Sequence, residues 1–150
     1  MTTPSPNDHL ESKSIELDQS AIVAFASRFD PQPYHLDAGA ADQSIFGGLC
    51  ASGWHIAALA TRLVIETLID NRLPFVEMTA VSQLKWSRPT FVKEHISVRV
   101  TLGASHEESP IANARCQSLE IEVCNGDGAV VATMTATAAI AIEPALAALT

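Results

Sequence analysis

The sequence is poor in several features that mark large classes of protein. Of its 150 residues only nine are Lys or Arg, against seventeen Asp or Glu, which gives a formal net charge of -8. Because the basic residues are few and form no cluster, the chain has no stripe that would neutralise phosphates, which argues against nucleic-acid binding. The acidic balance also gives no attraction to anionic membranes.

Long apolar runs and paired cysteines are missing as well. The most apolar stretch, residues 54–69, is interrupted by Thr61, Arg62 and Glu66, so no membrane-spanning segment is expected. The first residues contain no apolar signal core, and the three cysteines form no CxxC pair. We therefore expect a cytoplasmic protein with reduced thiols. His and Cys are too scattered for a zinc site, so we predict neither a metal nor a cofactor.

What the sequence does contain is enough apolar material for one packed domain. Hydrophobic residues make up 47% of the chain, and 150 residues is the size of a single ordinary domain. Ser, Pro and Asn at the start predict a flexible N-terminal leader over residues 1–12. We expect residues 13–150 to form one domain.

A short helix is predicted over residues 18–29, where apolar residues recur at helical spacing. It ends at Asp30, because a residue that precedes proline is disfavoured in helical conformation and Pro31 follows. Pro33 imposes the same restriction one step later. These prolines predict a stiff, non-helical turn over residues 30–34.

The longest helix candidate covers residues 52–70 and has a broad apolar face capped by Ser52. From residue 75 the apolar period changes to two, which predicts strands with one buried face. Trp86 falls on that inward face and is predicted to be core. The strands lie near residues 13–17, 75–86, 96–102, 119–123 and 130–140.

An antiparallel sheet must cover its apolar face, and the long helix is the only element available to do so. The sequence therefore predicts an α+β fold with a single domain, in which an antiparallel sheet wraps around a long central helix. This is the hot-dog arrangement.

Asp30 and His35 are the first candidates for chemistry, because they lie five residues apart on the proline-stiffened turn. The prolines lower the entropy cost of holding both groups in a fixed relation. A carboxylate and a neutral imidazole can together hold one water and move its proton. The same residues also fit a structural turn, since Asp-Pro is common turn chemistry and a single histidine is more often structural than catalytic.

The start of the long helix is the second candidate. Backbone N–H groups are unpaired there and carry partial positive charge, which suits an oxyanion. Gly53 would let a substrate oxygen approach the backbone closely. Glycine before a helix is also ordinary loop punctuation.

Together these residues resemble the signature of the MaoC-type dehydratase and (R)-specific enoyl-CoA hydratase family, which is Asp-x-x-Pro-x-His followed by an apolar segment and a glycine that opens the central helix. Asp30, Pro33 and His35 match this signature at the family spacing, and Gly53 follows His35 by eighteen residues. The resemblance implies that Asp30 and His35 hold and activate a water. It also implies that Gly53 donates its backbone N–H to the thioester oxygen.

The implied reaction is the reversible hydration of a trans-2-enoyl-CoA to an (R)-3-hydroxyacyl-CoA. The implied partner is an acyl-CoA or acyl-carrier-protein thioester, and the implied assembly is a homodimer, with joined sheets, or a higher homo-oligomer. The supporting hydroxyl of the family falls at Thr61, and Ser52 replaces a histidine that is frequent before the glycine. The residues predicted to bind substrate are Phe29, Ser52, Trp54 and Thr61.

Two other functions fit the same fold. A hot-dog acyl-CoA thioesterase would place an acid on the central helix as base, and Glu66 and Asp70 are the candidates toward its far end. They lie several turns beyond Gly53, which disfavours this alternative. The third possibility is a non-catalytic module that binds an acyl thioester.

Overall fold

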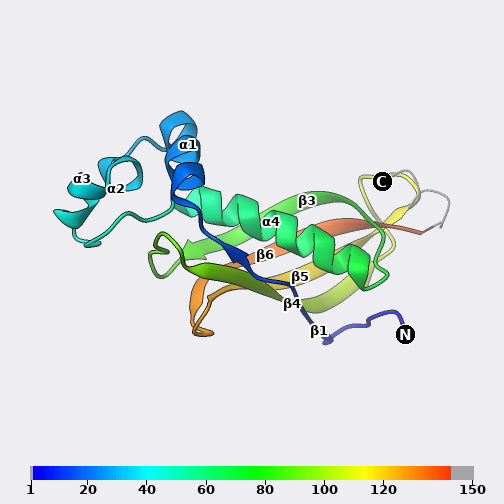
Figure 1. Cartoon of the computed structure of the whole chain (residues 1–150). Helices are drawn as coiled ribbons and strands as arrows, with labels where there is room; N and C mark the ends of the chain where they lie inside the picture. Colours follow the sequence, from blue (N-terminus) through cyan, green and yellow to red (C-terminus); the bar gives the residue numbers. More distant parts are fainter. Residues whose placement is uncertain (1, 143–150) are drawn as a thin grey trace.

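The structure, a computed structural model, describes residues 2–142, so the predicted domain end at residue 150 lies outside the described residues. A six-stranded antiparallel sheet packs against one long helix, α4 (Gly53–Asp70), which runs along one face of the sheet (Figure 1). This confirms the predicted α+β arrangement of a sheet around a central helix.

The strands follow the order β1-β4-β5-β6-β3, and β2 pairs with β4 beside β1. Every strand pair is antiparallel. The strand bounds are β1 (His9–Glu11), β2 (Ile15–Glu16), β3 (Phe75–Trp86), β4 (His95–His106), β5 (Ala114–Asn125) and β6 (Val130–Ala141).

The core lies between one face of α4 and the inward face of the sheet. Leu63, Val64 and Leu68 of the helix are fully buried, and they pack in one cluster with alternate residues of the strands, such as Val100 and Leu119. Each such side chain contributes roughly 1.5–3 kcal/mol relative to an exposed position. This packing holds α4 against the inward face of the sheet. Within residues 2–142 no helix has the length and apolarity to cross a bilayer.

The predicted leader over residues 1–12 needs correction, because β1 lies within it. Leu10 is only 8% exposed and pairs with Val100 of β4. The physical reason is that one apolar residue between two polar ones has the period of a strand and finds a partner edge on β4. The expected first strand near residues 13–17 is shorter than predicted and covers only β2.

Strand β3 lies at the edge of the sheet and breaks the alternation that the sequence predicts. Its register with β6 shifts between Phe75 and Glu77 and at two later places, and Gln83 has a positive φ of 52°. Each shift moves later side chains relative to the two faces. Trp86 is therefore 40% exposed and not a core residue as predicted.

Three helices gather at one end of the sheet, beside the start of α4 (Figure 1). They are α1 (Gln19–Phe29), α2 (Pro33–Leu36) and α3 (Ala38–Asp42). The turn predicted to be non-helical over residues 30–34 ends earlier than expected, since α2 begins at Pro33. Proline suits the first helical position, where its missing N–H would have no partner and its φ is already helical.

Candidate active site

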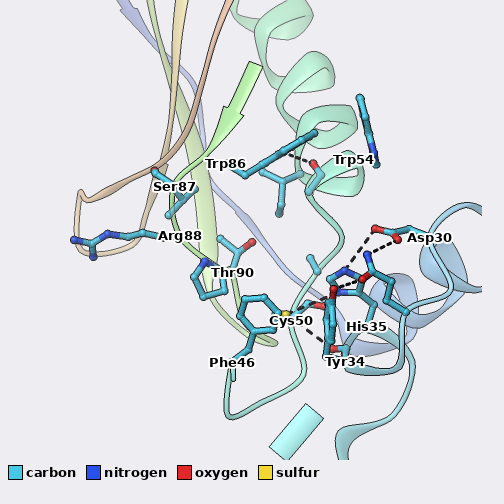
Figure 2. A pocket seen from close by; sticks show the side chains of 16 residues that line it. Asp30, Tyr34, His35, Phe46, Cys50, Trp54, Trp86, Ser87, Arg88 and Thr90 are labelled. Atoms are coloured by element: carbon cyan, nitrogen blue, oxygen red, sulfur yellow. Dashed lines mark hydrogen bonds and ion pairs between the residues drawn. The ribbon is translucent and has the colours of Figure 1, made fainter. Parts of the chain in front are cut away.

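A pocket of about 390 Å³ opens between the start of α4, the end of β3 and the short helix α2 (Figure 2). Its wall brings together four of the residues that the sequence singled out, which are Asp30, His35, Gly53 and Trp54. The first two come from the segment around α2, and the last two form the first turn of α4.

Hydrogen bonds hold both carboxylate oxygens of Asp30. The Gln32 side-chain amide donates to Oδ1 at 2.8 Å, and the Ser52 hydroxyl donates to Oδ2 at 2.7 Å. The Tyr34 hydroxyl in turn donates to the Gln32 side-chain oxygen, which leaves the amide nitrogen facing Asp30. The carboxylate therefore has a fixed position and a fixed orientation.

The His35 ring is buried and its two nitrogens have different surroundings. Nδ1 lies 2.7 Å from the Cys50 carbonyl oxygen, and because a carbonyl only accepts, Nδ1 carries the proton of the neutral ring. Nε2 lies 3.5 Å from Asp30 Oδ2. In the neutral ring Nε2 is therefore a free proton acceptor that faces the carboxylate.

The backbone around Cys50 fixes helix α2 to the segment before α4. Besides accepting from His35, Cys50 donates its N–H to the Tyr34 carbonyl at 3.2 Å. Its neighbour Ala51 donates to Thr90 at 2.8 Å, so the segment is also tied to the chain between β3 and β4. These bonds explain how residues from separate parts of the sequence keep one geometry. Burial raises the pKa of the Cys50 thiol, which keeps it protonated and unreactive.

Opposing effects act on the ionisation of Asp30. Burial raises its pKa, but the hydrogen bonds from Gln32 and Ser52, and the positive charge of His35 whenever its ring is protonated, together outweigh burial. The pKa of Asp30 therefore lies below its ordinary value, and the side chain is a carboxylate at neutral pH.

The first turn of α4 offers a backbone donor to the pocket. Ser52 caps the helix, and its hydroxyl oxygen accepts the Trp54 N–H at 3.2 Å. The Gly53 N–H has no hydrogen-bond partner among residues 2–142. Its hydrogen and the helix dipole both favour a negatively charged oxygen at this place.

Aromatic side chains form much of the remaining wall. Trp86 and Trp54 meet edge to face with ring centroids 4.9 Å apart, and the Trp86 indole N–H donates to the Gly53 carbonyl at 2.7 Å (Figure 2). Tyr34 packs against Phe46 in the same way, at 4.8 Å. The pocket is thus part apolar and part polar, as a site for an acyl group beside reacting atoms would be.

Three residues predicted to bind substrate are absent from the pocket wall. Phe29 is 67% exposed and packs on Phe25, and Thr61 lies two turns further along α4 and donates to the Ala57 carbonyl. Neither side chain lines this pocket, and the contact of both with a substrate stays a prediction. Ser52 is fully buried and lies behind the wall, where it contacts Asp30.

Sequence inspection did not single out Gln32, Tyr34 or Trp86 as parts of the site. Gln32 could have been found, because a polar side chain between two prolines and two residues from an acid can reach that acid. The position of Trp86 had no local signal, since it depends on the register of β3. Within residues 2–142 no group of three or more His, Cys, Asp or Glu is placed to hold a metal ion.

The hot-dog fold and a family match together indicate a protein of the hydratase and dehydratase class. Residues 2–119 match the family described as MaoC like domain. The match spans more than half of the chain, and the protein belongs to this family.

Solved structures agree with that assignment. The MaoC-like dehydratase from Rhodospirillum rubrum is 33% identical, with a TM-score of 0.79, and the alignment covers 94% of this chain and 95% of that one. The (R)-hydratase from A. caviae involved in PHA biosynthesis is 20% identical, with a TM-score of 0.71, covering 95% of this chain and all of that one, and shows the same fold.

A curated relative shares a shorter region. The uncharacterised protein YdeM of Bacillus subtilis (strain 168) is 38% identical over 56 residues, which are 37% of this chain and 40% of YdeM. The match thus spans less than half of that relative's length.

Proposed function

We propose that the protein catalyses the reversible addition of water to the double bond of a trans-2-enoyl thioester. The observation that carries the proposal is the pairing of Asp30 Oδ2 and His35 Nε2, 3.5 Å apart, in a pocket that also contains the unpaired Gly53 N–H. An acid, an imidazole and an oxyanion donor are the three groups that this reaction needs.

Asp30 and His35 would hold the attacking water between them. With Nδ1–H engaged by Cys50, Nε2 and the carboxylate are both acceptors, so one water can donate a hydrogen bond to each. Asp30 is the weaker base, because its pKa is lowered and both of its oxygens already accept hydrogen bonds. We therefore assign proton removal to His35 and orientation of the water to Asp30.

The electrons then follow a path that ends at the helix start. As the water oxygen bonds to C3 of the enoyl group, its proton passes to His35 Nε2 and the C2–C3 π electrons move onto the thioester oxygen. The Gly53 N–H and the dipole of α4 stabilise that oxyanion. The enolate collapses when C2 takes the proton held on His35, which restores the neutral ring. Dehydration is the same path in reverse.

The finer features of the substrate and assembly belong to the proposal. We propose an acyl-CoA or acyl-carrier-protein thioester and an (R)-3-hydroxyacyl product, in keeping with the family. We also propose a homodimer, because the outer edge of β3 has no strand partner among residues 2–142 and an open edge is a liability unless it is paired. The cytoplasmic location expected from the sequence stays a prediction.

The thioesterase alternative is disfavoured by the surroundings of Glu66. It pairs with Lys13 at 3.2 Å and with Arg62 at 2.9 Å, and it does not line the pocket. It lies thirteen residues beyond Gly53 on α4, or about 20 Å along the helix axis. No acid on α4 is therefore placed to activate a water at the thioester carbonyl near Gly53.

The test uses crotonyl-CoA and longer trans-2-enoyl-CoAs, with the loss of the enoyl absorbance and the release of free thiol followed in parallel. Hydration is expected in the wild type and is expected to vanish in Asp30→Asn and in His35→Ala. Free thiol without hydration would support the thioesterase. Neither activity on any chain length would support the binding module.

Matched control variants separate the site from general effects on the chain. Asp42→Asn on α3 and His106→Ala at the end of β4 change the same residue types at exposed positions away from the pocket. Both are expected to keep wild-type activity. Equal losses in the controls and in the site variants would remove the support for Asp30 and His35.

A further inference from the structure

The indole of Trp86 lies directly on Gly53. Its Nε1–H donates to the Gly53 carbonyl at 2.7 Å, although the two residues are 33 positions apart in the chain. A Cβ atom added to residue 53 would lie 2.7 Å from Cε2 of the indole and 2.8 Å from Cδ2 and Nε1. Ordinary contacts of a Cβ begin at 3.4 Å, so a side chain at residue 53 would have to displace the indole or the helix by about 0.7 Å.

The backbone that carries the indole is fixed by the sheet. Trp86 is the last residue of β3 and pairs with Ala132 of β6, and the next residue, Ser87, donates its N–H to Val131 at 2.9 Å. The ring of Trp54 meets it edge to face on the side of α4 (Figure 2). The sheet edge, through Trp86, thus holds the first residue of α4 by a hydrogen bond and by ring contact.

We infer that Trp86 is a positioning residue of the pocket, which fixes Gly53 so that its N–H faces the reacting oxygen, and that Trp86 is the reason residue 53 is glycine. The inference rests on the proposed function for its catalytic part. The steric part stands on the contact between the two residues alone. It differs from the sequence-based explanation, in which glycine leaves room for the substrate oxygen.

Three variants separate the two explanations. Gly53→Ala adds the Cβ in the presence of the indole, Trp86→Ala removes the indole, and the double variant combines them. Gly126→Ala is the matched control, since a Cβ there meets nothing within 4 Å. Trp86→Phe keeps one aromatic ring near Gly53 and loses the N–H donor together with the second ring of the indole.

With the wild-type chain as reference, Gly53→Ala is expected to reduce kcat for hydration by about tenfold or more, because displacements below 1 Å in a site can cost that much. KM is expected to change less, since the oxyanion forms only in the transition state. When Trp86 is already alanine, Gly53→Ala should reduce kcat by less than about threefold. A difference of that size is within the deviation from additivity that is usual for two residues that do not interact. Trp86→Phe should lower kcat with little change in KM.

The inference is overturned if Gly53→Ala costs the same fold in kcat with and without the indole, because the substrate would then be what requires the glycine. It is also overturned if Trp86→Phe and Trp86→Ala both leave kcat unchanged.

Thermal unfolding of the same variants tests the steric part without any substrate. Gly53→Ala should lower Tm only when Trp86 is present, and an equal drop in both backgrounds would refute it. A wild type that hydrates no enoyl thioester refutes the proposed function, and with it the catalytic part, while the unfolding experiment still decides the steric part.

Discussion

Replacement of Ser52 tests the link between the helix start and the carboxylate. The Ser52 side chain is fully buried and makes two hydrogen bonds, one as donor to Asp30 Oδ2 at 2.7 Å and one as acceptor from the Trp54 N–H at 3.2 Å. One hydroxyl therefore caps α4 and orients the proposed acid. Ser52→Ala and Ser52→Gly both remove the hydroxyl, but they differ in the quality of the remaining cap.

The expected magnitudes follow from these two bonds. A buried hydrogen bond to a charged group contributes about 1.5–3 kcal/mol. Loss of a serine cap to alanine costs about 1 kcal/mol, whereas glycine in its place costs only a few tenths. Ser52→Ala should therefore lower the free energy of unfolding by roughly 2–4 kcal/mol and Ser52→Gly by somewhat less. For a chain of this size each kcal/mol corresponds to about 2–4 °C in Tm.

Thermal unfolding, the rate of hydration and a carbon-13 NMR titration of the Asp30 carboxyl together make the assay. Both variants lose one of the bonds that lower the pKa of Asp30, so in both the Asp30 carboxyl should titrate at higher pH than in the wild type. The stability difference between them should be small and should reflect the cap. The reasoning fails if the Asp30 carboxyl of Ser52→Gly titrates as it does in the wild type, or if the two variants differ more in activity than in stability.

Three further predictions concern other residues of the pocket and its surroundings. Gln32→Leu removes the amide donor to Asp30 and should also raise the pH at which this carboxyl titrates, followed by carbon-13 NMR, while an unchanged titration would contradict the bond to Oδ1. Burial lowers the pKa of His55 in the folded protein below 6.5, the ordinary value for histidine. As the pH drops below 6.5, the imidazole is therefore protonated more in the unfolded chain than in the folded one, and the free energy of unfolding decreases. His55→Phe should therefore flatten the dependence of Tm on pH between about 7 and 5, and a dependence as steep as in the wild type would refute this. Thr61→Val should leave kcat and KM unchanged, because the hydroxyl bonds only within α4 and lies off the pocket wall.

The acid and the imidazole could be located from sequence because the chemistry that places them is local. Asp30 and His35 are separated by two prolines that restrict the backbone, and Ser52 marks the start of a strongly periodic helix. The bonds through Cys50 and Ser52 that bring these segments together are long-range, but each uses a residue within or beside a recognisable pattern.

The rest of the site depends on the register between β3 and β6, which the alternation of apolar and polar residues in the sequence cannot predict. Alternation along β3 placed Trp86 in the core, yet three register shifts in the strand and the positive φ of Gln83 bring the indole to Gly53. Thr61 fell on the apolar face of the predicted helix, but the pocket ends at the first turn of α4, near Ile56. The strand at Leu10 was missed because three residues carry too short a pattern without their partner on β4.

Incorporation of labelled oxygen is the most direct test of the central claim that Asp30 and His35 add water to an enoyl thioester. Wild-type protein is incubated with crotonyl-CoA in water enriched in oxygen-18, and the masses of the products are measured by mass spectrometry. The account predicts one heavy oxygen on the 3-hydroxyacyl-CoA product in the wild type and none in Asp30→Asn or His35→Ala. Heavy oxygen in a released free acid, or a 3-hydroxyacyl product formed equally well by the variants, would contradict it.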